Sequence, residues 1–168
     1  MVVGFSLGAQ LALRLGAEYP DIERCVCIST PMKFFHQYLP TQHVLKVAWL
    51  FANSSRSWPK RYPQGPGGPE YLIYPYMPLD ALFAVVDLCT MNRPLLGQFR
   101  VPLLMVHSRN DPACKLEGAR RVFSSVSSPY RRMLVFEKAP HGLMHDGSDE
   151  QRELLARSIL DFAGAEVS

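Results

Sequence analysis

Short apolar runs alternate with amphipathic segments along most of the 168-residue chain. The opening run Met1 to Phe5 is apolar, and Leu7 to Tyr19 carries leucine and alanine at helical spacing. Pro20 and Asp21 end that predicted helix, and Ile22 to Thr30 has the alternating and then apolar pattern of a strand. These segments predict a β-α-β unit, which implies a parallel sheet with a right-handed crossover.

The second half of the chain repeats the alternation of strands and helices. The predicted order is helix, strand, helix, strand, loop, at Pro78 to Leu96, Val101 to His107, Ala113 to Val126, Met133 to Phe136 and Lys138 to Met144. A final helix begins after Ser148, which with Gln151 predicts a capping box, and its apolar stripe comprises Leu154, Leu155, Ile159 and Phe162. The fold class is therefore α/β, a parallel sheet with flanking helices.

A long segment in the middle of the chain interrupts this alternation. Aromatic residues crowd the stretch from Phe34 to Phe51, which predicts one or two amphipathic helices. Asn53 to Pro69 contains the run GPGGP and predicts a loop. Because such a stretch is too long for an ordinary connection, we expect one domain over residues 1–168 with a helical cap inserted at about residues 31–77.

Composition excludes several classes of protein. The chain is 48% hydrophobic and 20% charged, as in a soluble globular domain, and it has no apolar run long enough to cross a membrane. Its 18 basic and 15 acidic residues give a net charge of +3, and the basic ones are dispersed, which argues against a nucleic-acid partner.

The four cysteines form neither a C-x-x-C pair nor a dense framework. Cys25, Cys27, Cys89 and Cys114 lack the second Cys or His pair that a zinc site needs. We therefore expect reduced, mostly buried thiols in a cytoplasmic protein, and no metal.

The first turn of the chain carries candidate chemistry. Gly4-Phe5-Ser6-Leu7-Gly8 matches G-x-S-x-G between a predicted strand and helix. Such a turn strains the serine backbone, and side chains in place of Gly4 or Gly8 are expected to collide with the strand and helix. It also presents the Ser6 hydroxyl at a helix N-terminus, where the Leu7 N–H is a candidate oxyanion donor. Ser6 is thus a candidate nucleophile, and the alternative is a purely structural turn.

A serine nucleophile needs a histidine to take its proton and a carboxylate to hold that histidine. Asp111 follows the predicted strand that ends at His107, where parallel sheets present functional groups. His141 lies in the loop after the next strand. Ser6, Asp111 and His141 therefore follow the chain order Ser, Asp, His of elbow-type hydrolases.

Each partner has an alternative. Asp111 could serve only as a turn residue that caps the following helix. His36 and His43 lie in the insertion and His107 in a strand, so His145 is the main rival to His141. We favour His141, because Pro140-His141-Gly142 predicts a tight loop apex, whereas His145 adjoins Asp146 near the last helix.

Three stretches together resemble the α/β-hydrolase superfamily, and most of all its small carboxylesterase and monoacylglycerol-lipase branch. They are VVGFSLGAQLALRLGAEYPDIERCVCISTPM, HSRNDPAC and APHGLMHD. The resemblance implies that Ser6 is the nucleophile, Asp111 the acid and His141 the base, and that a helical cap follows the second strand. Asp146 also matches a position where this branch often carries an acid.

The resemblance also implies that part of the fold is missing. Members of the family have further strands and helices before the elbow, so this chain is expected to be the C-terminal part, truncated at the N-terminus. The second oxyanion donor normally comes from that part, which leaves the Leu7 N–H with the Ala9 N–H or a group of the cap as a candidate helper. The first strand would then expose an apolar edge at Val2 and Phe5, through which a homodimer is expected.

These observations favour a serine ester hydrolase that acts on small or medium-chain carboxylic esters or monoacylglycerols. The expected partner is a small-molecule ester, and no cofactor is expected. Two alternatives stay open. The chain could be a catalytically weak or inactive hydrolase fragment that acts as a binding module, or another serine hydrolase of this fold, namely a thioesterase, amidase or peptidase.

Overall fold

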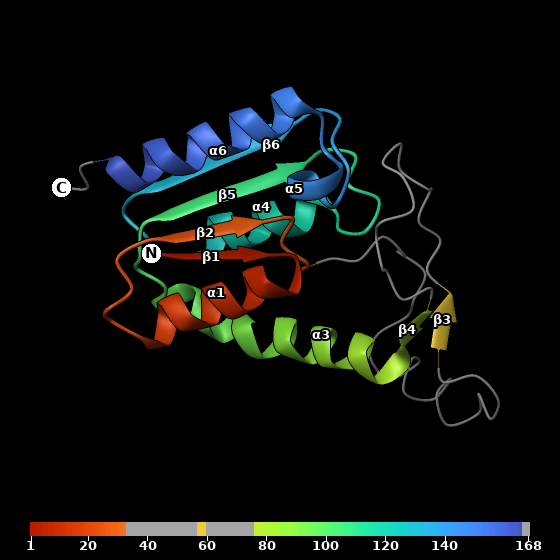
Figure 1. The fold of residues 1–168 in the computed structure, drawn as a ribbon. Coiled ribbons are helices and arrows are strands. Elements are labelled where there is room, and N and C mark those ends of the chain that lie inside the picture. Colours follow the sequence, from red (N-terminus) through yellow and green to blue (C-terminus); the bar gives the residue numbers. More distant parts are fainter. Residues whose placement is uncertain (33–56, 60–75, 166–168) are drawn as a thin grey trace. The chain divides into compact units, whose positions relative to one another are not determined.

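The computed structural model describes residues 1–32, 57–59 and 76–165. Within them the chain forms a four-stranded parallel sheet in the order β1-β2-β5-β6 and a separate antiparallel pair of β3 with β4 (Figure 1). The elements are β1 (Val2–Phe5), α1 (Leu7–Glu18), β2 (Cys25–Ile28), β3 (Ser57–Pro59), β4 (Tyr76–Pro78), α3 (Leu79–Asn92), the 3-10 helix η1 (Arg93–Gln98), β5 (Leu103–Ser108), α4 (Leu116–Ser125), β6 (Arg131–Phe136), α5 (Leu143–Asp146) and α6 (Asp149–Gly164). The predicted α/β class with a parallel sheet is confirmed.

Helices cover both faces of the parallel sheet. Side chains of α1, η1 and α4 form one buried cluster with β2 and β5, and those of α5 and α6 form a second with β2, β5 and β6. Figure 1 shows α1 and α6 on opposite sides of the sheet. Alternate residues of β2 supply the two clusters, as the period of two in a strand requires.

The register of the sheet brings the carboxyl ends of its strands to the same end of the sheet. Phe5 pairs with Ile28, Ile28 with Val106, and Val106 with Leu134. The residues that follow these strands therefore lie at one end of the sheet, where open parallel sheets place their functional groups.

Helix α1 packs on the sheet through small residues. Ala9, Ala12 and Gly16 are buried, and a Cβ on Gly16 would lie 2.5 Å from Cε2 of Phe99. The predicted helix is confirmed, but three of the leucines that indicated it, Leu7, Leu11 and Leu15, are 38–48% exposed.

A buried polar network joins the two segments that flank residues 33–88. The Gln10 side-chain amide donates to the Pro31 carbonyl at 2.6 Å, and Asn92 Nδ2 donates to Gln10 O and Oε1 at 2.8 and 2.9 Å. The Cys89 thiol also donates to the Pro31 carbonyl, at 2.8 Å. Pro31 and Asn92 are thereby held to the same turn of α1.

At the C-terminus, the guanidinium of Arg24 caps helix α6. Its Nε donates to the Phe162 carbonyl at 3.0 Å, and its Nη2 donates to the Ala165 carbonyl. The N-terminus has the predicted capping box, in which Ser148 and Gln151 exchange hydrogen bonds. The predicted core face of this helix is wrong at Leu154, which is 46% exposed, whereas Leu155 and Phe162 are buried.

Several predicted boundaries are wrong. Ser57–Pro59 form strand β3 inside the predicted loop Asn53 to Pro69, because a three-residue strand is too short to produce a readable period. The helix predicted over Pro78 to Leu96 divides at Arg93, where Pro94 lacks the N–H that an α-helix needs.

Two more boundaries differ near the carboxyl edge of the sheet. Helix α4 begins at Leu116 rather than Ala113, because the N–H groups of Ala113 and Cys114 bind the Asp111 carboxylate. The predicted loop Lys138 to Met144 ends early, since Leu143 begins the one-turn helix α5.

The chain divides into two compact units, residues 1–35 with 89–168, and residues 36–88. The first holds the parallel sheet, and the second includes β3 and β4. The helices predicted over Phe34 to Phe51 lie outside the described residues, so the cap at about residues 31–77 stays a prediction. Within the described part of the chain, every helix is too short or too polar to span a bilayer.

Candidate active site

Ser6 occupies a strained turn between β1 and α1. Its backbone has φ 51° and ψ −118°, and its N–H donates to the Ile28 carbonyl at 2.9 Å. The turn requires glycine at position 4, because a Cβ there would lie 2.2 Å from the Gly8 carbonyl oxygen. The matching expectation for Gly8 is wrong, since no described atom lies within 4 Å of a Cβ built there.

Three candidate residues form a continuous hydrogen-bonded row. His141 Nε2 lies 3.0 Å from the Ser6 hydroxyl oxygen, and His141 Nδ1 lies 2.8 Å from Asp111 Oδ2. The three come from the ends of β1, β5 and β6, which the sheet register brings together. Because Asp111 can only accept, Nδ1 carries a proton and Nε2 is free to accept the Ser6 hydroxyl proton.

The Asp111 carboxylate is held in its charged form although it is 3% exposed. Its Oδ1 accepts the N–H groups of Ala113 and Cys114 at 2.7 and 2.8 Å. Burial raises the pKa of Asp111, but the hydrogen bond and charge of His141, with these two N–H groups, outweigh it and lower the pKa overall. The same carboxylate therefore accepts the two N–H groups of the turn and lies within hydrogen-bond distance of His141.

His107 packs beside this carboxylate as a buried neutral group. Its Nε2 lies 3.0 Å from the Cys114 carbonyl and 3.9 Å from Asp111 Oδ2, so Nε2 carries the proton. Nδ1 has no hydrogen-bond partner among the described residues. Burial lowers the pKa of His107, against the raising effects of the Cys114 carbonyl and Asp111.

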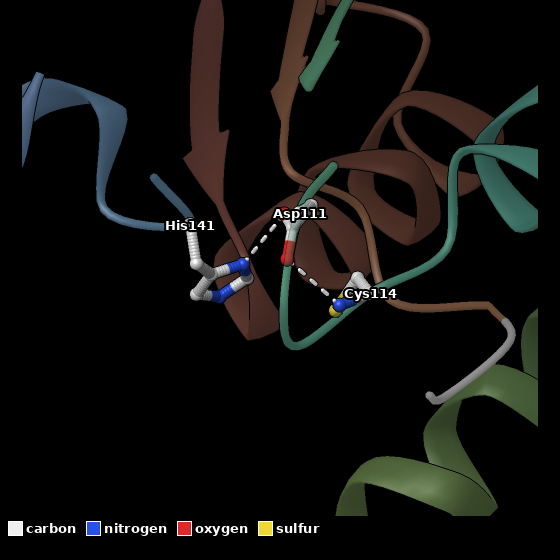
Figure 2. A group of neighbouring side chains, drawn as sticks. All are labelled: Asp111, Cys114 and His141. Atoms are coloured by element: carbon white, nitrogen blue, oxygen red, sulfur yellow. Dashed lines mark hydrogen bonds and ion pairs between the residues drawn. The ribbon is translucent and has the colours of Figure 1, made fainter. Parts of the chain in front are cut away.

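One set of side chains has metal-ligand character. Ligand atoms of Asp111, Cys114 and His141 lie within 4.8 Å of one another, and Figure 2 shows His141 and Cys114 on either side of the Asp111 carboxylate. Burial and the charge of Asp111 raise the pKa of Cys114 well above its usual value, so the thiol stays protonated. This cluster is better suited to holding Asp111 than to binding a metal. All four cysteines are free and buried, as predicted.

The other candidates lie elsewhere. His145 and Asp146 are exposed in α5, and the N–H of each donates to the Gly142 carbonyl. His36 and His43 lie outside the described residues. Leu7 begins α1, so its N–H has no acceptor within the helix. The Ala9 N–H donates to the Ser6 carbonyl at 2.9 Å and is therefore not a helper for an oxyanion.

Three contacts around His141 were not anticipated from the sequence. The Phe5 ring lies 5.2 Å from the imidazole centroid, and the Ser29 and Ser108 hydroxyls bond to the backbone of the His141 loop. The available signal was a serine at the end of two predicted apolar strands, which a pattern search for catalytic residues passes over.

A known protein family matches most of the chain. Residues 1–148 match the family model described as serine aminopeptidase, S33. The chain belongs to this family of α/β-hydrolases. A search of the curated proteins finds no match.

Solved structures of lipolytic enzymes share the fold. A structure reported with the metagenome-derived lipolytic enzymes LipS and LipT is 18% identical, with a TM-score of 0.78, and the match covers 97% of this chain and 64% of that one. The monoacylglycerol lipase of Paleococcus ferrophilus is 18% identical, with a TM-score of 0.74 and coverages of 95% and 66%. A soluble variant of Saccharomyces cerevisiae monoglyceride lipase is 11% identical, with a TM-score of 0.72 and coverages of 96% and 60%. The chain thus spans less than two thirds of the length of each.

Proposed function

We propose that this chain carries the catalytic residues of a serine ester hydrolase, which cleaves small to medium-chain carboxylic esters or monoacylglycerols. The observation that carries the proposal is the hydrogen-bonded row from the Ser6 hydroxyl through His141 to the Asp111 carboxylate. Each of these residues supplies a different role, so the reaction needs neither a metal nor an organic cofactor.

The proposed reaction has two halves. Ser6 Oγ attacks the ester carbonyl as His141 Nε2 takes its proton, and the Leu7 N–H stabilises the tetrahedral oxyanion. The bond to the alcohol then breaks, the alcohol leaves with the proton from His141, and an acyl-Ser6 remains. Water, deprotonated by His141, hydrolyses this acyl-enzyme and releases the acid.

The choice of substrate class rests on two kinds of support. Lipases and a lipolytic enzyme share the fold, and the aromatic residues between Phe34 and Trp58 favour an apolar acyl chain. The family description names a peptidase, so an amidase or peptidase is the second candidate, with a thioesterase beside it. A catalytically weak fragment that acts as a binding module is the non-enzymatic alternative.

The cysteine thiols and the edge strand β1 support proposals for the location and the oligomeric state of the protein. Four free buried cysteines suit the reducing cytoplasm, which we propose as its location. Among the described strands β1 pairs with β2 alone, and Val3 is 44% exposed, so we propose a homodimer through this edge.

A fluorophosphonate probe tests the nucleophile directly. We expect labelling of the wild type, none of Ser6→Ala, and unchanged labelling of Ser128→Ala, which loses a buried hydroxyl that bonds the Tyr130 carbonyl instead. Turnover of p-nitrophenyl esters, a monoacylglycerol, an acyl thioester and an aminoacyl anilide then ranks the substrate classes. Absence of Ser6-dependent labelling in folded protein contradicts the proposal and favours the binding module, and a preference for the anilide favours the peptidase.

A further inference from the structure

Two buried serines hold the loop that carries His141. Ser29 Oγ donates to the His141 carbonyl at 3.0 Å, and Ser108 Oγ accepts the Ala139 N–H at 3.0 Å. These serines are 1% and 2% exposed. Ser108 therefore binds the loop at Ala139, two residues before His141, and Ser29 binds the backbone of His141 itself.

The two serines belong to neighbouring strands. Ser108 ends β5, and Ser29 directly follows β2, with its N–H donating to the Val106 carbonyl at 2.8 Å. The central strands of a buried sheet are rigid, so each hydroxyl has a fixed position. The hydrogen bond from each hydroxyl therefore restrains the loop relative to the sheet. The Phe5 ring packs against the imidazole at 5.2 Å between centroids, which restricts the ring itself.

Ser29 holds its position at a conformational cost. Its φ is 51°, and among the described residues the only other non-glycine residue at positive φ is Ser6. A positive φ at a serine is uncommon and carries an energetic cost. Glycine would adopt this φ more easily but would provide no hydroxyl. Strain at the nucleophile and at the residue bonded to the His141 carbonyl points to a functional constraint at both.

We infer that Ser29 and Ser108 are positioning residues, which fix the His141 loop so that Nε2 stays within reach of Ser6. This inference rests on the proposed function. Loss of either hydrogen bond lets the loop move away from Ser6, and a misplacement of about 1 Å can lower turnover by about 100-fold. Both hydroxyls are buried and bond the backbone of the loop, so their loss is expected to lower kcat and to leave KM unchanged.

The kinetic test uses three variants and an ester substrate. Ser29→Gly removes the hydroxyl and relieves the backbone strain, and Ser108→Ala removes the acceptor. We expect each to lower kcat by about tenfold or more with KM unchanged. Ser128→Ala, the loss of a buried hydroxyl that bonds a carbonyl elsewhere, is expected to retain wild-type kcat. If Ser108→Ala does not fold, Ser108→Cys replaces it, since sulfur keeps the volume and accepts weakly.

A second measurement does not depend on catalysis. The proton on His141 Nδ1 is hydrogen-bonded to the Asp111 carboxylate and is expected to give a far-downfield proton resonance. Loss of this resonance in His141→Gln assigns it. Faster solvent exchange of this proton in Ser29→Gly and Ser108→Ala, but not in Ser128→Ala, supports the inference even if the wild type hydrolyses no ester, in which case only the proposed function fails. Exchange as slow as in Ser128→Ala, or an unchanged kcat in an active enzyme, overturns it.

Discussion

His141 Nε2 lies 3.0 Å from the Ser6 hydroxyl oxygen, although 135 positions separate the two residues in the chain. Neither residue is in a regular element: each follows a parallel strand, β1 or β6, at the carboxyl end of the sheet. Two intervening strands hold them in register. The alignment of the strands, more than local sequence, therefore sets this distance.

Asp111→Asn is expected to lower kcat by about 1,000- to 10,000-fold. The amide can donate to Nδ1, which favours the imidazole tautomer with its proton on Nε2, and that tautomer cannot accept the Ser6 proton. Ester turnover measures the loss. Asp146→Asn, a change at an exposed carboxylate, is the control and is expected to leave kcat within about twofold. A comparable loss in Asp146→Asn would transfer the acid role to that residue.

Gly4→Ala is expected to destabilise the fold by about 3 kcal/mol, because its Cβ would lie 2.2 Å from a backbone carbonyl oxygen. Gly8→Ala is the matched control. No described atom lies within 4 Å of its Cβ, and alanine in a helix is favoured over glycine by about 0.5–1 kcal/mol. Chemical denaturation of both variants gives the comparison, and equal stabilities would contradict the steric explanation.

Arg24→Ala is expected to cost about 1–2 kcal/mol and to fray the end of α6, because the guanidinium bonds two terminal carbonyls of that helix. Arg157→Ala removes an exposed ion pair with Glu153 on the same helix and should cost about 0.5 kcal/mol or less. Urea denaturation and hydrogen exchange at Phe162 provide the measurements. Similar losses in both variants would mean that charge, and not capping, stabilises this helix.

His107 is expected to make the free energy of unfolding depend on pH. Its pKa is lowered in the folded protein, so the unfolded chain binds a proton first as the pH falls through about 6.5. The free energy of unfolding should therefore decrease as the pH falls from about 6.5 towards the lowered pKa. Urea titrations of the wild type and His107→Gln at several pH values test this, and the variant should show the smaller slope. Parallel curves would remove His107 as the cause.

Val3→Lys is expected to shift the protein from dimer towards monomer. Val3 lies on the edge strand β1 and is 44% exposed, so a lysine can replace it. The charge of that lysine should disfavour pairing of β1 with a strand of a second chain. Leu160→Lys, at a position 70% exposed on α6, is the control for added charge. Light scattering over a range of concentrations measures the mass. A monomeric wild type would contradict the proposed edge interface.

Local patterns were sufficient for the central elements. The apolar runs predicted the strands of the parallel sheet, because buried parallel strands are apolar on both faces. The capping box at Ser148 and the strand-turn-helix around Ser6 are also local, since each depends on a few adjacent residues. The chain order of Ser6, Asp111 and His141 then indicated which side chains to expect together at the carboxyl end of the sheet.

Contacts between residues far apart in the chain could not be predicted from sequence patterns. The buried face of α1 depends on how closely the helix approaches the sheet, so Ala12 is buried while Leu11 is exposed. The bonds from Ser29 and Ser108 to the His141 loop join positions 112 and 31 apart in the chain. Serine at a strand end is common, and only the folded register gives these two a partner.

The polar network around Gln10 has a consequence for how this scaffold could be altered. Pro31 and Asn92 are fastened to one turn of α1, so the stretch of chain between them starts and finishes at fixed points. Grafting a replacement of different length or composition there should leave the hydrogen-bonded row of Ser6, His141 and Asp111 undisturbed. A change in that stretch is therefore separated from Ser6, His141 and Asp111 by two anchored ends, so its sequence can vary without moving these three residues.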